Sequence, residues 1–223
     1  MSIVRNPSGA GTPVIELKGV SKRFGRTHHD VAARAGRSLK RAFGGEVKEA
    51  VVRAVNDVDL TINRGEVVGL VGESGCGKST VGRMVAGIMP PSDGRVLFHG
   101  RDVATLAAAE AKQAALQIQM IFQDPYASLN PRLRVAEIVG EAPWVHGLVE
   151  RDAWEGYVDD QLRRAGLDPA YKRRYPHQFS GGQRQRIGIA RALAVQPEFL
   201  VCDEAVAALD VSIQAQILNL FMD

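Results

Sequence analysis

Short apolar runs alternate with segments of helical periodicity along most of the chain. Runs that end in turns predict strands at residues 14–17, 51–62, 66–71, 96–99, 118–122 and 199–202. Apolar side chains that recur every three or four positions predict helices over residues 78–88, 154–166 and 213–220. Strands that alternate with helices in this way favour an α/β domain built around a mostly parallel sheet.

The pattern changes over residues 125–179, where helical periodicity dominates. Asp152 and Glu155 have the spacing of a capping box at the start of the helix that ends at Gly166. We therefore expect residues 1–124 and 180–223 to form a core, with residues 125–179 as an inserted helical subdomain.

Composition narrows the possible functions. The chain has 223 residues with 45% hydrophobic and 24% charged positions, which is typical of a globular protein of one substantial domain. A net charge of +3 and 6% aromatic residues give no reason to expect nucleic-acid binding. The longest apolar runs are far shorter than the ~20 residues that span a bilayer. The basic segment 25–50 is consistent with a solvated loop or with a contact to anionic lipid headgroups.

The strongest motif is a phosphate-binding loop between a predicted strand and a predicted helix. The segment Gly72-Glu73-Ser74-Gly75-Cys76-Gly77-Lys78-Ser79 matches G-x-x-x-x-G-K-S/T. Its glycines allow backbone N–H groups to converge on phosphate oxygens, and the following helix adds its positive end. Lys78 is expected to reach the β- and γ-phosphates, and the Ser79 hydroxyl to bind Mg²⁺. The segment predicts that the chain binds a nucleoside triphosphate.

Two acids follow the apolar strand predicted at residues 199–202. Ligands bind at the carboxyl ends of strands in open α/β sheets, so Asp203 and Glu204 are placed for chemistry. Asp203 is expected to hold Mg²⁺, and Glu204 to act as the general base for the attacking water.

A third element, Phe179-Ser180-Gly181-Gly182-Gln183, precedes another helical pattern. Ser180 and Gln183 form a capping box, which is a sufficient structural reason for both residues. It does not explain Gly181 and Gly182, because glycine in a first helical turn costs up to about 1 kcal/mol relative to alanine. Glycines there suit a phosphate that approaches the backbone, and since the chain already has one phosphate loop, we expect two facing chains to complete each other's sites.

These three elements together resemble the nucleotide-binding subunits of ABC transporters, over nearly the whole chain. Residues 72–79 resemble the Walker A loop, 199–204 the Walker B strand and 179–183 the ABC signature. The resemblance implies an α/β P-loop NTPase fold of the RecA-like type, with an N-terminal antiparallel β portion and the inserted helical subdomain. It also implies ATP and Mg²⁺ as ligands. Gln123 occupies the Q-loop position, which implies contact with Mg²⁺ and the attacking water, Asp210 falls in the D-loop, and Phe24 is placed to stack on adenine. The implied ATP-binding set is Phe24, Gly72, Ser74, Gly75, Cys76, Gly77, Lys78, Ser79 and Thr80.

Finer features resemble the ATPases of di- and oligopeptide importers. Residues 119–132 and 175–179 carry this likeness. It implies a second ATP-binding subunit as partner, identical or paralogous, and two transmembrane permeases. It also implies an extracytoplasmic binding protein that acts indirectly, and a peripheral location on the cytoplasmic face of the inner membrane. Related importers that carry nickel or glutathione have very similar ATPases.

The sequence departs from the family pattern in three places, and these departures leave alternative functions open. Family members carry a switch histidine well after the catalytic glutamate, but no histidine follows Glu204 in this sequence. Ala205 stands where proline is usual and Ala207 where serine is usual. We therefore expect a C-terminally truncated subunit with ATP binding and weak hydrolysis. The alternatives are a soluble ABC-type ATPase of translation or DNA repair, and a non-hydrolysing nucleotide-binding module.

Overall fold

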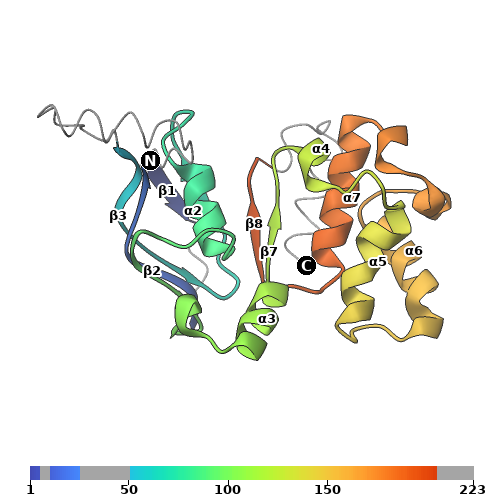
Figure 1. Ribbon diagram of the computed structural model, residues 1–223, viewed down its shortest axis with the longest axis horizontal. Helices are drawn as coiled ribbons and strands as arrows, with labels where there is room; N and C mark the ends of the chain where they lie inside the picture. Colours follow the sequence, from blue (N-terminus) through green and yellow to red (C-terminus); the bar gives the residue numbers. More distant parts are fainter. Residues whose placement is uncertain (6–10, 26–50, 205–223) are drawn as a thin grey trace, which may run out of the picture. The chain divides into compact units, whose positions relative to one another are not determined.

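The computed structural model describes residues 1–5, 11–25 and 51–204, and it divides into two compact units (Figure 1). Unit 1 comprises Met1–Met84 and Met89–Thr105, and unit 2 comprises Val85–Ile88 and Leu106–Asp223. The helix predicted at residues 213–220 and almost all of the basic segment lie outside the described residues.

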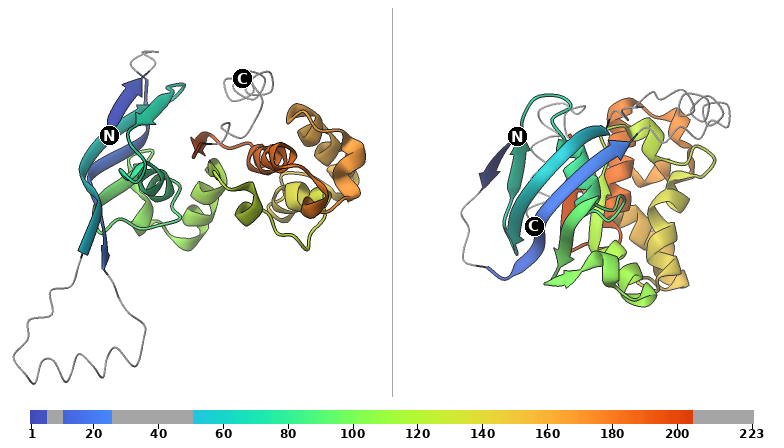
Figure 2. Two further views of the ribbon diagram at one scale, coloured as in Figure 1. Left: turned by 90° about the horizontal axis from the view of Figure 1, so that it is seen from above. Right: turned by 60° about the vertical axis from the view of Figure 1, so that its left-hand side comes forward.

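An antiparallel sheet of four strands forms most of unit 1. Its strands, in spatial order, are β3 (Val51–Asn63), β2 (Pro13–Gly25), β5 (Asp93–Phe98) and β6 (Arg101–Asp102). The long strands β2 and β3 run side by side (Figure 2). Alternate apolar side chains bury one face of this sheet, namely Ile15, Leu17, Val20, Leu60, Ile62 and Val96.

The second part of unit 1 is a strand, loop and helix. Strand β4 (Val68–Val71) pairs antiparallel with β1 (Ser2–Arg5), a strand that the apolar pattern did not predict. Helix α2 (Lys78–Val85) follows the loop and is shorter than predicted. Gly87, two residues after the last residue of the helix, takes a left-handed conformation at φ 69°, which ends the helix. A short 3₁₀ turn, η1 (Val103–Thr105), follows β6.

Unit 2 contains a pair of parallel strands. Helix α3 (Ala108–Gln117) leads into β7 (Ile118–Ile121), and β7 pairs in parallel register with β8 (Phe199–Cys202). Both strands were predicted, and their parallel pairing was expected for the core of an α/β fold. Within the described ranges, the pairings of unit 1 are antiparallel, as expected for its N-terminal β portion.

Helices make up the rest of unit 2. Between β7 and β8 the chain forms α4 (Pro125–Ser128), α5 (Val135–Val145), η2 (Arg151–Ala153), α6 (Trp154–Arg164), η3 (Pro169–Arg173), η4 (Pro176–Gln178) and α7 (Gly181–Leu193). One apolar cluster joins these elements: Leu129, Val135, Ile138, Val139, Val158, Leu162, Ala165, Leu167, Phe179, Ile187, Ala190 and Ala194. Within the described part of the chain, no helix combines the length and apolarity that a bilayer span requires.

The cluster fixes how α5 and α6 pack. Trp154 donates its indole N–H to the Gly140 carbonyl at 2.8 Å. A Cβ atom at Gly140 would lie 2.4 Å from the same indole nitrogen, so only glycine allows this contact. Because the cluster includes Ile187 and Ala190 of α7, the predicted subdomain 125–179 packs against the helix that follows it.

The start of α6 corrects one prediction. Residues 151–153 form the 3₁₀ turn η2, and α6 begins at Trp154 with Ala153 as its N-cap and no side-chain cap. The capping box predicted from Asp152 and Glu155 is therefore wrong.

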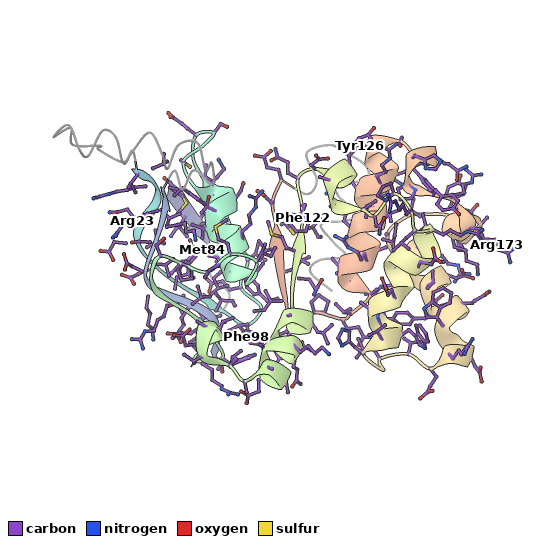
Figure 3. All side chains as sticks on the ribbon, in the orientation of Figure 1. Arg23, Met84, Phe98, Phe122, Tyr126 and Arg173 are labelled. Atoms are coloured by element: carbon purple, nitrogen blue, oxygen red, sulfur yellow. The ribbon has the colours of Figure 1, made fainter. Side chains whose placement is uncertain are left out.

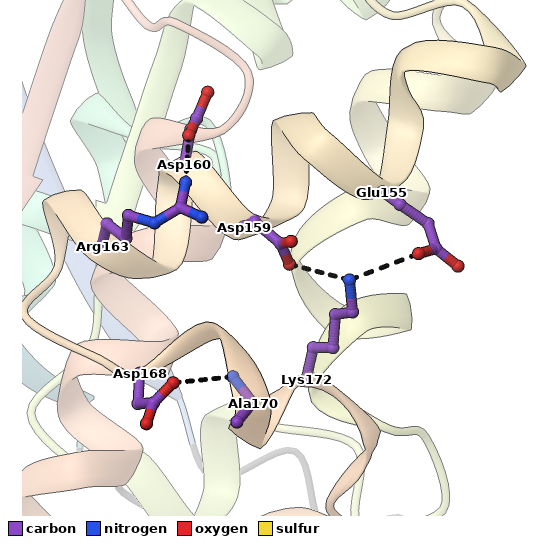
Figure 4. Close-up of polar contacts among 7 residues, drawn as sticks. All are labelled: Glu155, Asp159, Asp160, Arg163, Asp168, Ala170 and Lys172. Atoms are coloured by element: carbon purple, nitrogen blue, oxygen red, sulfur yellow. Dashed lines mark hydrogen bonds and ion pairs between the residues drawn. The ribbon is translucent and has the colours of Figure 1, made fainter.

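Glu155 instead takes part in an ion-pair cluster (Figure 4). Lys172 of η3 donates to Asp159 at 2.9 Å and to Glu155 at 3.3 Å, both on α6. The hydrogen bond to Asp159 is the main cause that raises the Lys172 pKa, with the Glu155 carboxylate adding to it. Asp168 caps η3 through the Ala170 N–H at 2.8 Å. The two contacts of Lys172 hold η3 against α6.

Candidate functional site

The phosphate loop of unit 1 joins β4 to α2, as predicted. Cys76 N–H donates to the Glu73 carbonyl at 3.3 Å, which closes a turn inside the loop. Val81 N–H donates to the Gly77 carbonyl at 2.9 Å, which is the first bond of α2. Val81 and Met84 are each 1% exposed, so the helix is anchored by its apolar face (Figure 3). The backbone N–H groups of the first helical turn have no carbonyl partner within a helix, and they give its N-terminus an affinity for anions.

Lys78 is folded over this loop. Its Nζ atom donates to the Gly72 carbonyl at 2.8 Å and to the Glu73 carbonyl at 2.9 Å, and it lies 4.0 Å from the Cys76 Sγ atom. The ammonium group is therefore held next to the loop by the loop's own carbonyl oxygens. A compact, strongly hydrated charge in this position is suited to phosphate oxygens.

Gly77 is required by sterics. Its φ is 101°, a conformation that side chains rarely adopt, and a Cβ atom there would lie 2.4 Å from the Ala54 carbonyl oxygen of β3. Gly75 is also left-handed at φ 79°, but a Cβ atom there would meet open space. The glycine at position 77 thus allows the loop to pack closely against the backbone of β3.

The remaining predicted ATP-binding residues of unit 1 lie around the loop or at the end of β2. Gly72 and Ser74 are exposed, and Ser79 and Thr80 are half-buried in the first turn of α2. Phe24 is 39% exposed near the end of β2, with the Lys22 ammonium 5.6 Å from its ring centre.

In unit 2, the parallel pairing of β7 and β8 brings two predicted residues together. Ile121 is the register partner of Cys202, and Asp203 N–H donates to the Ile121 carbonyl at 3.0 Å. Gln123 and Glu204 follow at the same carboxyl edge, and Gln123 Nε2 donates to Glu204 Oε2 at 2.5 Å. Sequence reasoning placed both residues at strand ends but did not predict this contact.

The Glu204 backbone is left-handed at φ 50°, which is costly for a residue with a side chain and is typical of functional sites. Glu204 and Gln123 are exposed, whereas Asp203 is half-buried.

The third predicted element caps α7. Gln183 N–H donates to Ser180 Oγ at 3.3 Å, and Ser180 N–H donates to Gln183 Oε1 at 3.1 Å, which confirms the capping box. A Cβ atom at Gly181 would meet nothing within 4 Å, so packing within the described chain does not require a glycine there. Gly182 is half-buried in the same turn. Asp210, the predicted D-loop residue, lies outside the described residues, as do Ala205 and Ala207.

Sequence reasoning missed three polar residues of α7. Arg184, Gln185 and Arg191 extend to the segment 122–128, which contains Gln123. The available signal was a pair of polar residues, Arg184 and Gln185, at positions of the helix that are 8% and 2% exposed.

The sequence profile of the ABC transporter family matches residues 55–207. The chain belongs to this family. A Brucella abortus protein, named as a candidate peptide import ATP-binding protein, is 53% identical over 174 residues, which are 78% of this chain and 52% of that protein. The oligopeptide transport ATP-binding protein OppF of Bacillus subtilis is 51% identical over 174 residues, 77% of this chain and 57% of OppF. The chain therefore spans about half the length of the curated relatives it matches.

Solved structures support the same family. A structure described as the dimeric post-hydrolysis state of an ATP-binding cassette bound to ADP and Pi matches with a TM-score of 0.73 and 27% identity, over 93% of this chain and 81% of that one. Together with the family match, this confirms the predicted P-loop NTPase fold class.

Proposed function

We propose that this chain is the ATP-binding and ATP-hydrolysing subunit of an ABC importer for di- or oligopeptides. The observation that best supports nucleotide binding is the position of Lys78. Its ammonium group lies over the phosphate loop, at 2.8 and 2.9 Å from two carbonyl oxygens of the loop. The names of the relatives, which describe peptide import and oligopeptide transport, support the substrate class.

The loop fits a triphosphate. Its Gly72–Gly75 portion is exposed, and the start of α2 contributes a positive helix end. Phosphate oxygens can replace the Gly72 and Glu73 carbonyls as partners of Lys78. Phe24, exposed at the end of β2, supplies a face for the adenine ring.

Oxygen-bearing side chains fit Mg²⁺. The residues that would hold it are Ser79 by its hydroxyl, Asp203 by its carboxylate and Gln123 by its amide oxygen, which are the ligand types this ion prefers. When bound, Mg²⁺ neutralises charge that develops on the transferred phosphoryl group.

Glu204 is the proposed general base. It accepts a proton from the water whose oxygen attacks the γ-phosphorus, while the bond from that phosphorus to the bridging oxygen breaks and ADP leaves. Gln123 supports this role, because its amide donates to Glu204 Oε2 at 2.5 Å and thereby orients the carboxylate. Lys78 stabilises charge on the phosphate oxygens.

The Ser180–Gln183 element is proposed to contact the triphosphate held by a second subunit, which is either a copy of this chain or a paralogue. The open space around a Cβ atom at Gly181 supports this, since the glycine has no packing reason within the described chain. Asp210 is proposed to lie at the same subunit interface.

Two transmembrane permeases are the proposed partners at the membrane, with residues 125–179 as the helical subdomain that faces them. An extracytoplasmic binding protein then acts indirectly, and the chain is peripheral on the cytoplasmic face of the inner membrane.

Purification from gently solubilised membranes tests this proposal. The tagged full chain is expected to recover two multi-spanning permeases, and the ATPase activity of that complex is expected to rise when a peptide-loaded binding protein is added. Recovery of soluble partners alone, or stimulation by nickel or glutathione rather than peptide, would overturn the import of peptides as the function.

A further inference from the structure

Three side chains of α7 hold the segment that contains Gln123. Gln185 Nε2 donates to the Phe122 carbonyl at 3.3 Å, and Arg191 donates to the Ser128 carbonyl at 2.5 Å. The Arg184 guanidinium lies 3.8 Å from the centre of the Tyr126 ring. Figure 3 labels Phe122 and Tyr126 on this segment, which follows β7. The segment 122–128 is thus attached to α7 at its start, its middle and its end.

Gln123 lies between two anchored neighbours. On one side Gln185 holds the Phe122 carbonyl, and on the other Asp124 caps α4 by accepting from the N–H groups of Tyr126 and Ala127 at 2.8 and 3.3 Å. The exposed Gln123 side chain starts from a backbone with little freedom. This explains how it can meet Glu204 at 2.5 Å.

Burial gives Gln185 a cost in folding free energy, because one of its polar atoms is unpaired. Gln185 is 2% exposed, and among the described residues its Oε1 atom has no hydrogen-bond partner. An unpaired buried acceptor costs at least as much free energy as one neutral hydrogen bond contributes net. The hydrogen bond from Gln185 to the Phe122 carbonyl therefore does not outweigh the unpaired oxygen, and stability alone does not explain Gln185.

Arg184 and Arg191 have a similar character. Arg184 is 8% exposed, and it also donates to the Pro176 carbonyl at 2.8 Å, in the turn that precedes Ser180. Burial lowers the pKa of Arg191. Neither arginine has a carboxylate partner among the residues that the structure describes. Their partners on the segment 122–128 are a carbonyl oxygen and an aromatic face.

We propose that Gln185 is the positioning residue for Gln123, with Arg184 and Arg191 holding the rest of the segment 122–128 against α7. Gln185 lies one turn after Gly181, so a displacement of the Ser180 end of α7 moves the Phe122 carbonyl and with it Gln123. This inference rests on the proposed function, because it makes Gln123 respond to whatever ligand engages Ser180.

Gln185→Met separates positioning from stability. It keeps the shape and removes both the donor and the unpaired oxygen. Removal of the unpaired oxygen offsets the loss of the donor to the Phe122 carbonyl, so we expect a melting temperature close to that of the wild type. We also expect about tenfold faster amide exchange over residues 121–128, and a kcat for ATP that falls about 10- to 100-fold while KM stays within about twofold.

Gln161→Met is the matched control. Gln161 is 4% exposed on α6, and its Oε1 atom also has no partner among the described residues. We expect this variant to leave both exchange over residues 121–128 and kcat as in the wild type. Tyr126→Leu, at a side chain that is 66% exposed, provides a second variant with no risk to the core. It is expected to speed exchange over residues 125–128.

The inference is overturned if Gln185→Met and Tyr126→Leu both keep wild-type exchange over residues 121–128, or if Gln185→Met keeps wild-type kcat. A wild-type chain that binds and hydrolyses no ATP would instead overturn the proposed function. The exchange measurements would then still decide whether α7 holds the segment.

Discussion

The phosphate loop of unit 1 and the Gln123–Glu204 pair of unit 2 are built in different ways. In the loop, the backbone makes the geometry: left-handed Gly77 packs against the Ala54 carbonyl, and the loop's own carbonyls hold Lys78. At the ends of β7 and β8, two exposed side chains make the geometry, by one hydrogen bond of 2.5 Å. Substitutions of the left-handed glycines in the loop should therefore affect folding and binding together, whereas substitutions at the strand ends should affect turnover alone.

Glu204→Gln gives the largest expected effect. The amide cannot accept the proton of the attacking water, so phosphate release should fall about 10³-fold. Because Glu204 is exposed, the free energy of unfolding and the affinity for ATP should stay near wild type. Exposed Glu150→Gln is the control and should keep full turnover. Undiminished turnover in Glu204→Gln would remove Glu204 from the role of base.

Gly77→Ala should lower the free energy of unfolding by about 3 kcal/mol, because both the left-handed backbone and the nearby Ala54 carbonyl oppose a Cβ atom. Gly75→Ala is the matched control. Its φ angle is also positive, but a Cβ atom there would meet open space, so the expected loss of unfolding free energy is about 1 kcal/mol. Chemical denaturation measures both values, and equal losses would show that the contact with β3 does not shape the loop.

At the start of α7, substitution of one residue should affect stability, and substitution of the next residue should affect turnover. Ser180→Ala removes the cap and should cost about 1 kcal/mol. Gly181→Ala should leave stability unchanged or raise it by up to about 1 kcal/mol, since a Cβ atom there meets open space. If Gly181 serves a phosphate from a second subunit, Gly181→Ala should nevertheless reduce the turnover of the assembled transporter. Wild-type turnover would argue against that contact.

Lys172→Met provides a baseline at a residue that belongs to neither of these regions. The ion pairs of Lys172 with Asp159 and Glu155 are partly exposed, so the loss should be at most about 1 kcal/mol. The Lys172 pKa is raised above 10.5 in the folded protein, so its stabilisation is complete below that pH and disappears as pH rises through the raised value. The difference between wild type and variant in thermal unfolding should therefore shrink above pH 10.5. A constant difference would contradict the pKa direction.

Local chemistry made much of this structure predictable. The strand before the phosphate loop, the helix after it and the capping box at Ser180 each depend on residues within a few positions of one another. The strands β7 and β8 were each predicted from an apolar run of strand length. In each case the pattern is short and the competing structures are few.

Other features depend on contacts between distant residues. The Gln123–Glu204 hydrogen bond joins residues 81 positions apart, and the Gln185–Phe122 contact joins residues 63 apart, so no local pattern encodes either. The capping box at Asp152 was wrong although its spacing fits, because the 3₁₀ turn η2 shifts the start of α6 to Trp154. Spacing alone does not fix where a helix begins when a second type of turn is possible.

The binding of ATP by the full chain, compared with that of Lys78→Ala, tests the central claim most directly. Calorimetric titration in the presence of Mg²⁺ should give a Kd at least about 100-fold weaker for the variant, equivalent to about 2.7 kcal/mol. The variant's melting temperature without nucleotide should match the wild type, because Lys78 is only half-buried. Equal affinities in the two proteins would contradict the assignment of the loop as the triphosphate site.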